Sequence, residues 1–222
     1  MGKEKNTAIA PVSQREPLGS LVLYKALKWT IVQPILSSYF RSRVIGLENV
    51  PTTGGFIAVS NHASNFDPPI LAAAVGRPVA FMAKEELFRV PILKQIIRIY
   101  GAYPVKRGAG DRAAIRAALA SLQEGWGVGI FLQGTRTADG RVTKPKSGAV
   151  LIATKAQVPL IPISLIGTEK ILKGKNPFPH PTALTIRIGE AIAPPKTVTK
   201  EALTQTTETC AHQINALHAL GR

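Results

Sequence analysis

A histidine and an aspartate stand close together in the stretch "VSNHASNFDPPIL", which begins at Val59. His62 and Asp67 follow the strand-like run "GFIAVS" and precede an apolar segment typical of a helix. An imidazole beside a carboxylate is suited to moving protons near neutral pH. However, "DPP" is also a common helix start, with an acidic cap followed by Pro68 at the first helical position. The two residues are therefore either a catalytic pair or a polar loop residue beside a helix cap.

The composition predicts a folded protein with an anionic partner. Lys+Arg 28 against Asp+Glu 13 gives a net charge of +15, yet 45% of the residues are hydrophobic, which is too many for a disordered basic tail. The partner could be nucleic acid, an acidic lipid surface or a phosphorylated small molecule. An aromatic fraction of 6% and the lack of a recognisable nucleic-acid-binding motif argue against nucleic acid. The single Cys210 is expected to be a small buried residue rather than a nucleophile.

The N-terminal part of the chain divides into two segments. Residues 1–17 contain charges and prolines without the apolar core of an export signal, and we expect a flexible tail. Residues 18–40 are mostly apolar, but Lys25 and Lys28 lie inside this segment and Pro34 interrupts it. Each central lysine would cost about 2.5–3.5 kcal/mol in a membrane span. A helix in the membrane interface avoids that cost, with an apolar face of Leu21, Trp29, Val32 and Ile35. The alternative is a helix packed on the core of the protein.

Residues 41–222 alternate between strand-like and helix-like segments. Strands are predicted at residues 55–60, 79–83, 101–105, 127–132, 160–165 and 183–189. Helices are predicted at residues 68–75, 84–100, 111–125, 148–157 and about 200–220. This alternation predicts an α/β domain with a largely parallel sheet flanked by helices, preceded by the N-terminal interfacial helical segment. Chemistry in such sheets gathers at the carboxyl ends of the strands, here in loops 61–67, 106–112 and 133–148.

Several common catalytic motifs are absent from the sequence. It contains no G-x-S-x-G elbow, which argues against a serine hydrolase of the α/β type. The glycines of "GWGVGI" have the wrong spacing for a dinucleotide fingerprint, and "GKNP" lacks the upstream glycine of a P-loop. His 4 and Cys 1 are scattered, so no metal site is predicted.

Four blocks resemble, in order and spacing, those of the glycerolipid acyltransferases, most closely the 1-acylglycerol-3-phosphate (lysophosphatidic acid) acyltransferase family. The blocks are "NHASNFD" (Asn61–Asp67), "GAYPVKR" (Gly101–Arg107), "FLQGTR" (Phe131–Arg136) and "VPLIPI" (Val158–Ile163). The resemblance covers about Gly46 to Gly189. It implies transfer of a fatty acyl group to the free hydroxyl of lysophosphatidate, forming phosphatidate. The acyl donor would be a thioester of coenzyme A or of acyl carrier protein, without a cofactor.

The resemblance also implies roles for individual residues. His62 would be the general base and Asp67 would orient its ring, so that no covalent acyl-enzyme is needed. Because a carboxylate has two oxygens, Asp67 could hold His62 and also cap the helix, so the two interpretations need not exclude each other. The substrate phosphate would contact first Arg107 and Arg136, then Lys84, which stands in the segment "FMAKEEL". Two further phosphate-binding candidates offer backbone N–H groups and a hydroxyl, and they are Gly134 and Thr135. The secondary substrate candidates are Asn61, Gln133, Lys106, Lys144 and Lys146.

Two residues depart from the family pattern. Gln133 replaces the usual glutamate, which would weaken any ion pair that holds an arginine, and Lys106 replaces a frequent aspartate. Both changes make the phosphate pocket more positive. An acyltransferase with another acceptor is therefore an alternative, with glycerol 3-phosphate, another lysophospholipid or an aminoacyl lipid in that role. Another is an inactive basic protein that binds membranes or nucleic acid.

Both substrates of the implied reaction carry acyl tails, which predicts a place for the protein in the cell. We expect a membrane-associated enzyme, monotopic on the cytoplasmic face, that does not bind nucleic acid. The sequence does not specify the oligomeric state, the acyl donor or the chain length.

Overall fold

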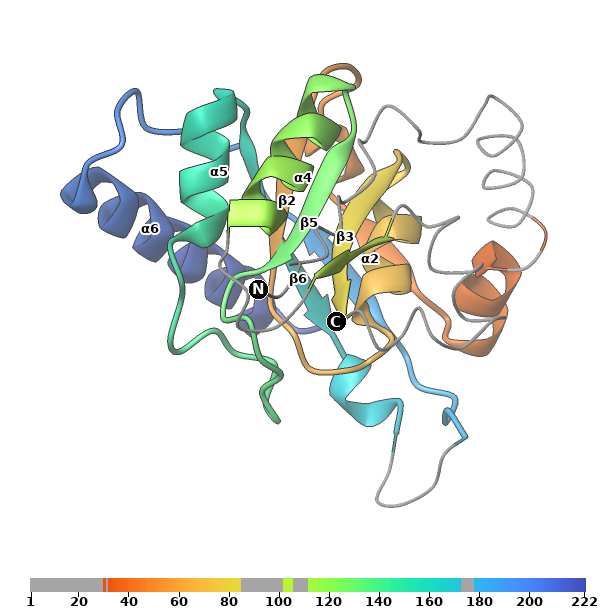
Figure 1. Cartoon of the computed structure of the whole chain (residues 1–222). Coiled ribbons are helices and arrows are strands. Elements are labelled where there is room, and N and C mark those ends of the chain that lie inside the picture. The colour runs from red at the N-terminus through yellow and green to blue at the C-terminus, as the bar shows by residue number, and fades with distance from the viewer. Residues whose placement is uncertain (1–29, 31, 85–101, 106–111, 173–177) are drawn as a thin grey trace, which may run out of the picture.

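The computed structural model describes residues 30, 32–84, 102–105, 112–172 and 178–222, without the side chains of 82–84 and 102–105. The predicted helix at 84–100 therefore falls almost entirely outside the described residues. The helices and strands are a π-helical turn Ile35–Tyr39, β1 Arg43–Ile45, a 3-10 turn Leu47–Asn49, β2 Phe56–Ser60, α2 Asp67–Val75, β3 Val79–Lys84, β4 Ala102–Val105, α4 Arg112–Gln123, β5 Gly127–Phe131, α5 Gly148–Ala156, β6 Leu160–Ile166, a 3-10 turn Thr168–Lys170, β7 Thr185–Ile188 and α6 Lys200–Ala219 (Figure 1).

The strands form one seven-stranded sheet in the order β1-β7-β6-β2-β5-β3-β4. Strands β2 to β6 are parallel to their neighbours within that group, whereas β7 pairs antiparallel with β6 and carries β1 parallel to itself. The prediction of a largely parallel α/β fold is confirmed, and each of the six predicted strands is present. β1 was not predicted, because its three residues are exposed and show no alternation.

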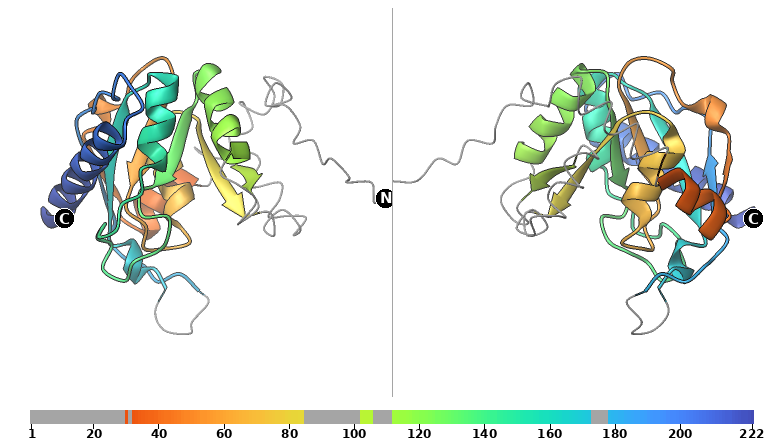
Figure 2. Two further views of the ribbon diagram at one scale, coloured as in Figure 1. Left: turned by 60° about the vertical axis from the view of Figure 1, so that its left-hand side comes forward. Right: turned by 90° about the vertical axis from the view of Figure 1, so that its right-hand side faces the viewer.

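Helices cover both faces of the sheet (Figure 2). Along β2, Phe56 and Ala58 face a core that includes α2 and the π-helical turn. Ile57 and Val59 face the opposite core, to which α4, α5 and α6 contribute. All five residues of β2 are buried, as expected for a central strand covered on both sides. The sequence signal for this strand was accordingly a continuous apolar run.

Cys210 belongs to α6, on the side that packs into the core, and is fully buried. Burial raises the pKa of its thiol to about 12, since a thiolate would lose its hydration there. The thiol is thus uncharged near neutral pH. This agrees with the expectation of a buried residue that does not act as a nucleophile.

Most of the predicted interfacial segment 18–40 lies outside the described residues. In its described end, Leu36 and Phe40 are buried in the core, whereas Ile35 and Tyr39 are 47% and 43% exposed. Val32, expected on the membrane-facing side, instead packs partly buried against the core. Within the described part of the chain, no helix is both long and apolar enough to cross a membrane.

Glycine in β5 allows a row of aromatic rings to reach the end of the sheet. Gly129 is opposite Phe81 of β3, and a Cβ added at Gly129 would lie 2.2 Å from an atom of the Phe81 ring. The Phe81 ring in turn stacks near Phe131, with 6.2 Å between centroids. Phe131 is the last residue of β5. Its ring contacts His62, which lies in the loop after the neighbouring strand β2. The small size of Gly129 is therefore required for this packing.

We expect Gly129→Ala to lower the free energy of unfolding by about 1–3 kcal/mol, because the Phe81 ring must move out of its position. Gly148→Ala is the matched control, since a Cβ there meets nothing within 4 Å. Urea denaturation of both variants tests this expectation. Equal stability of the two variants would contradict it.

Candidate active site

His62 and Asp67 form a hydrogen-bonded pair in the loop between β2 and α2. The distance from His62 Nδ1 to Asp67 Oδ2 is 2.7 Å. The backbone N–H groups of Ala63 and Ser64 donate to the same carboxylate oxygen, each at 2.7 Å. Asp67 has no exposed side-chain surface, and His62 retains 18%. The ring is thus held by a fixed, buried carboxylate while part of it remains open to a substrate.

The helix-cap interpretation of Asp67 was wrong in its geometry. The carboxylate bonds backward to the loop and makes no capping bond to α2. Pro68 and Pro69 follow Asp67 directly and have no N–H to be capped. Asp67 still lies in the first turn of α2, where the helix dipole stabilises a negative charge.

The ring of His62 is oriented from a second side by Phe131. The two rings stack with 3.9 Å between centroids and 13° between planes. Because the Asp67 carboxylate accepts a hydrogen bond from Nδ1–H, a neutral ring has its lone pair on Nε2. That atom is the one that can accept a proton from a substrate. The pair therefore has the geometry of a general base and the group that orients it.

The loop 133–148, which follows β5, lies beside His62 because β5 pairs with β2 in the sheet. Thr137 N–H donates to the His62 carbonyl oxygen at 2.8 Å. Gln133 Oε1 accepts from the N–H groups of Thr143 at 2.8 Å and Lys144 at 3.1 Å. Gln133 therefore closes the loop on itself, a role that the sequence did not suggest. A neutral amide oxygen provides these bonds without the charge of a glutamate.

Asn61 connects three parts of the site. Its Nδ2 donates to the carbonyl oxygens of Gly140 and Leu165, each at 2.8 Å, and its Oδ1 accepts from Leu165 N–H at 2.8 Å. The side chain is 1% exposed. Both amide hydrogens are used within the protein, so Asn61 joins loop 133–148 to the end of β6. The sequence contained no signal for this bridge, since Leu165 is 104 positions away.

Only some of the predicted phosphate contacts lie among the residues that the structure describes. Gly134, Thr135 and Arg136 are exposed at the start of loop 133–148, as are its residues Lys144 and Lys146. A Cβ at Gly134 would lie 3.4 Å from Lys146 Nζ, which places that ammonium group beside the glycine. Lys84 ends β3, but its side chain is not described. The predicted phosphate contacts Lys106 and Arg107 lie outside the described residues.

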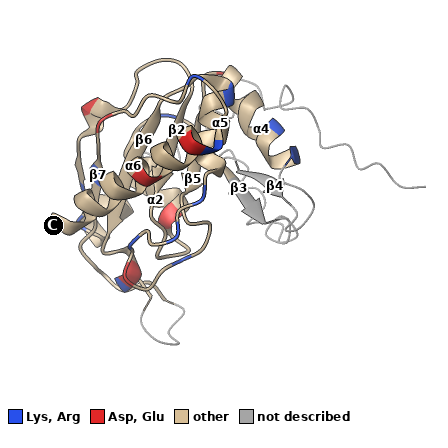
Figure 3. Ribbon diagram, turned by 90° about the vertical axis from the view of Figure 1, so that its left-hand side faces the viewer, with Lys and Arg blue, Asp and Glu red and all other residues tan. Residues whose placement is uncertain are grey.

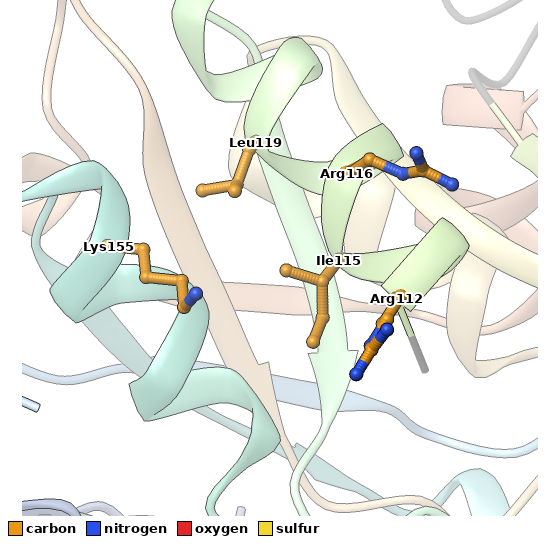
Figure 4. A pocket seen from close by; sticks show the side chains of 5 residues that line it. All are labelled: Arg112, Ile115, Arg116, Leu119 and Lys155. Atoms are coloured by element: carbon orange, nitrogen blue, oxygen red, sulfur yellow. The ribbon is translucent and has the colours of Figure 1, made fainter. Parts of the chain in front are cut away.

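A separate hollow of about 470 Å³ lies between α4 and α5 (Figure 4). Ile115 and Leu119 of α4 project toward α5, from which Lys155 reaches back. Arg112 and Arg116 complete the lining, and α4 has basic but no acidic residues (Figure 3). No predicted site residue lines this hollow. Among the residues that the structure describes, no cluster of His, Cys, Asp and Glu could hold a metal ion.

Residues 41–166 match the family model described as Acyltransferase. The chain belongs to the acyltransferase family. The 1-acyl-sn-glycerol-3-phosphate acyltransferase of Bacillus subtilis is 33% identical over 148 residues, which are 64% of this chain and 72% of that acyltransferase. A chloroplastic 1-acyl-sn-glycerol-3-phosphate acyltransferase of Brassica napus is 33% identical over 137 residues, 60% of this chain but 40% of that protein. The predicted resemblance to the 1-acylglycerol-3-phosphate acyltransferase family is confirmed.

A solved acyltransferase has the same fold. The crystal structure of the 1-acyl-sn-glycerophosphate (LPA) acyltransferase PlsC from Thermotoga maritima superposes with a TM-score of 0.72 at 28% sequence identity. The match covers 89% of this chain and 80% of that one.

We expect Gln133→Leu to lower the free energy of unfolding by about 1–3 kcal/mol, because the N–H groups of Thr143 and Lys144 lose their acceptor. Gln133→Glu keeps an acceptor oxygen at the same place and should remain close to the wild type. Thermal unfolding of the two variants makes the comparison. Similar losses in both would contradict the assignment of the effect to these hydrogen bonds.

Proposed function

We propose that this acyltransferase moves a fatty acyl group from an acyl thioester to the free hydroxyl of lysophosphatidate, which forms phosphatidate. The observation that carries the proposal is the 2.7 Å bond between His62 and the fully buried Asp67, beside an exposed cationic loop. The names of the relatives from Bacillus subtilis and Thermotoga maritima support the same acceptor. The chain spans less than two thirds of the length of other relatives, including the one from Brassica napus.

His62 acts as the general base in this reaction. An alcohol is a weak nucleophile until its proton is removed, and His62 Nε2 accepts that proton as the oxygen attacks the thioester carbonyl. Asp67 fixes the tautomer and stabilises the imidazolium that forms. The new C–O bond then replaces the C–S bond, and the imidazolium returns the proton to the leaving thiolate. The acyl group passes directly to the acceptor without a covalent intermediate on the protein.

The phosphate of the acceptor binds beside loop 133–148. Arg136 offers a planar fork of donors that matches phosphate oxygens, and Thr135 adds a hydroxyl. The N–H of Gly134 already donates to the Phe131 carbonyl oxygen at 2.9 Å, so Gly134 contributes by leaving space for the phosphate rather than as a donor. The position of this loop next to His62 supports the assignment, because Thr137 bonds to the His62 carbonyl. Lys84 and Arg107 are further phosphate contacts in this proposal. The donor is an acyl thioester of coenzyme A or of acyl carrier protein, and the reaction needs no cofactor.

We expect His62→Ala to reduce kcat by at least about a hundredfold, because a positioned general base contributes that much or more. Asp67→Asn should also lower turnover severely, since an amide does not stabilise an imidazolium as a carboxylate does. His212→Ala, an exposed histidine on α6, is the matched control. Purified proteins are incubated with labelled acyl thioester and lysophosphatidate, and the product is identified by chromatography. Near-full turnover by His62→Ala would refute the mechanism.

The segment 18–40 attaches the enzyme to the membrane in this proposal, as a monotopic protein on the cytoplasmic face. Both substrates have acyl tails that partition into bilayers, so a site at the membrane surface gains access to them. At its described end, Leu36 and Phe40 anchor the segment in the core while Ile35 and Tyr39 remain exposed. The net charge of +15 adds attraction to anionic lipids, about 1 kcal/mol per basic residue near the surface.

We expect removal of residues 1–29 to release the protein from vesicles while Leu36 and Phe40 still complete the core. Co-sedimentation with phosphatidylglycerol and phosphatidylcholine vesicles compares the full-length and truncated chains. High salt should only partly release the full-length chain, because apolar burial is not screened. Undiminished vesicle binding by the truncated chain would contradict the attachment through this segment.

A further inference from the structure

The last turns of α6 hold the middle of loop 133–148. Val142 N–H donates to Asn215 Oδ1 at 2.9 Å, and Asn215 Nδ2 donates to the Val142 carbonyl oxygen at 2.8 Å. Val142 is 4% exposed, so its backbone groups need partners within the protein. A primary amide presents one donor and one acceptor side by side, as a peptide unit does. Asn215 thus makes with Val142 the two hydrogen bonds that a residue of a neighbouring β-strand would otherwise make.

The helix that provides Asn215 is itself fixed to the core. Cys210 and Ile214 are fully buried, in the core that also includes α5 and one face of β2. Asn215 follows Ile214 directly, so its amide has little freedom to move with the loop. The paired bonds therefore fix the position of Val142 relative to the sheet.

One turn further along α6, His218 packs against Gly140. A Cβ added at Gly140 would lie 2.8 Å from His218 Nε2 and 3.3 Å from Asn61 Nδ2, and φ at Gly140 is 68°. Only glycine combines this close approach with a positive φ. The Gly140 carbonyl oxygen also accepts the bond from Asn61 Nδ2. The loop is therefore enclosed between α6 on one side and the residue that precedes His62 on the other.

This contact leads directly to the proposed catalytic residues. From Gly140 the chain runs back to Thr137, whose N–H donates to the His62 carbonyl oxygen, and then to Arg136. In the other direction Val142 is followed by Thr143, which is bonded to Gln133. Val142 and Arg136 thus belong to one hydrogen-bonded loop beside His62.

We propose that Asn215 is a positioning residue of the acyltransferase, which sets the place of Arg136 for the phosphate of the acceptor. This inference rests on the proposed function. Asn215 touches neither His62 nor Asp67 through any bond in the described part of the chain, and it acts through loop 133–148. It lies beyond residue 166, where the match to the family model ends. It was not among the residues that the sequence motifs indicated.

The test compares Asn215→Leu, which keeps the size but loses both bonds, with Asn215→Asp, which keeps the acceptor for Val142 N–H. His212→Ala on the same helix is the control. Steady-state kinetics with the full chain vary lysophosphatidate and a long-chain acyl-coenzyme A separately, well below the unfolding temperature of each variant. We expect the KM for lysophosphatidate to rise about tenfold in Asn215→Leu, the effect of losing two hydrogen bonds of ordinary strength. Asn215→Asp should be intermediate, and kcat should change less than KM.

A coupling measurement separates positioning from general loss of structure. In Arg136→Ala the phosphate contact is already gone, so adding Asn215→Leu should raise the KM for lysophosphatidate little further. Multiplying effects in the double variant would overturn the proposal, as would a KM for Asn215→Leu equal to that of the wild type. A fall in kcat alone would also overturn it. Failure of the proposed function would appear in the wild type itself, whereas failure of this inference appears only in variants of an active wild type.

Discussion

The structure depends above all on one buried carboxylate. Asp67 has no exposed surface, and a carboxylate without partners in such a place would be very unfavourable. Three donors, from His62, Ala63 and Ser64, converge on its Oδ2 atom and offset part of that cost, while its Oδ1 atom is buried without a hydrogen-bond partner among the described residues. These bonds hold the loop between β2 and α2 around the carboxylate. The orientation of the His62 ring therefore follows from the need to satisfy Asp67.

The sheet brings the second half of the site to this pair. Because β2 is paired with β5, the loops that follow the two strands meet at one edge. Phe131, at the end of β5, stacks on His62 and is packed in turn against Phe81. Gly129 leaves the space that the Phe81 ring occupies. The ring that moves a proton in the proposed reaction is thus the end of a row of core residues, and its orientation depends on core packing.

The sequence predicted the parts that have local signals. Apolar runs bounded by turn residues predicted the central strands, and the motif blocks predicted which loops are chemically important. The antiparallel direction of β7 and the existence of β1 have no local signal, since both depend on how the last strands return to the sheet. Substrate contact was the only role foreseen for Asn61. Its bonds to Gly140 and Leu165 span 79 and 104 positions, which no local pattern encodes.

The hydrogen bonds of Gln133 and the charge of loop 133–148 together account for a glutamine at position 133. Three neutral amides hold loop 133–148, and they are Gln133, Asn61 and Asn215. The loop contains four basic residues and one acidic one, namely Arg136, Arg141, Lys144, Lys146 and Asp139, which gives 4 − 1 = +3. A glutamate at position 133 would hold the same backbone groups but reduce this charge by one. Neutral amides instead fix the backbone and leave the positive charge available to an anion. The loop is thus held by hydrogen bonds and cationic at once, a combination that suits the phosphate recognition proposed for it.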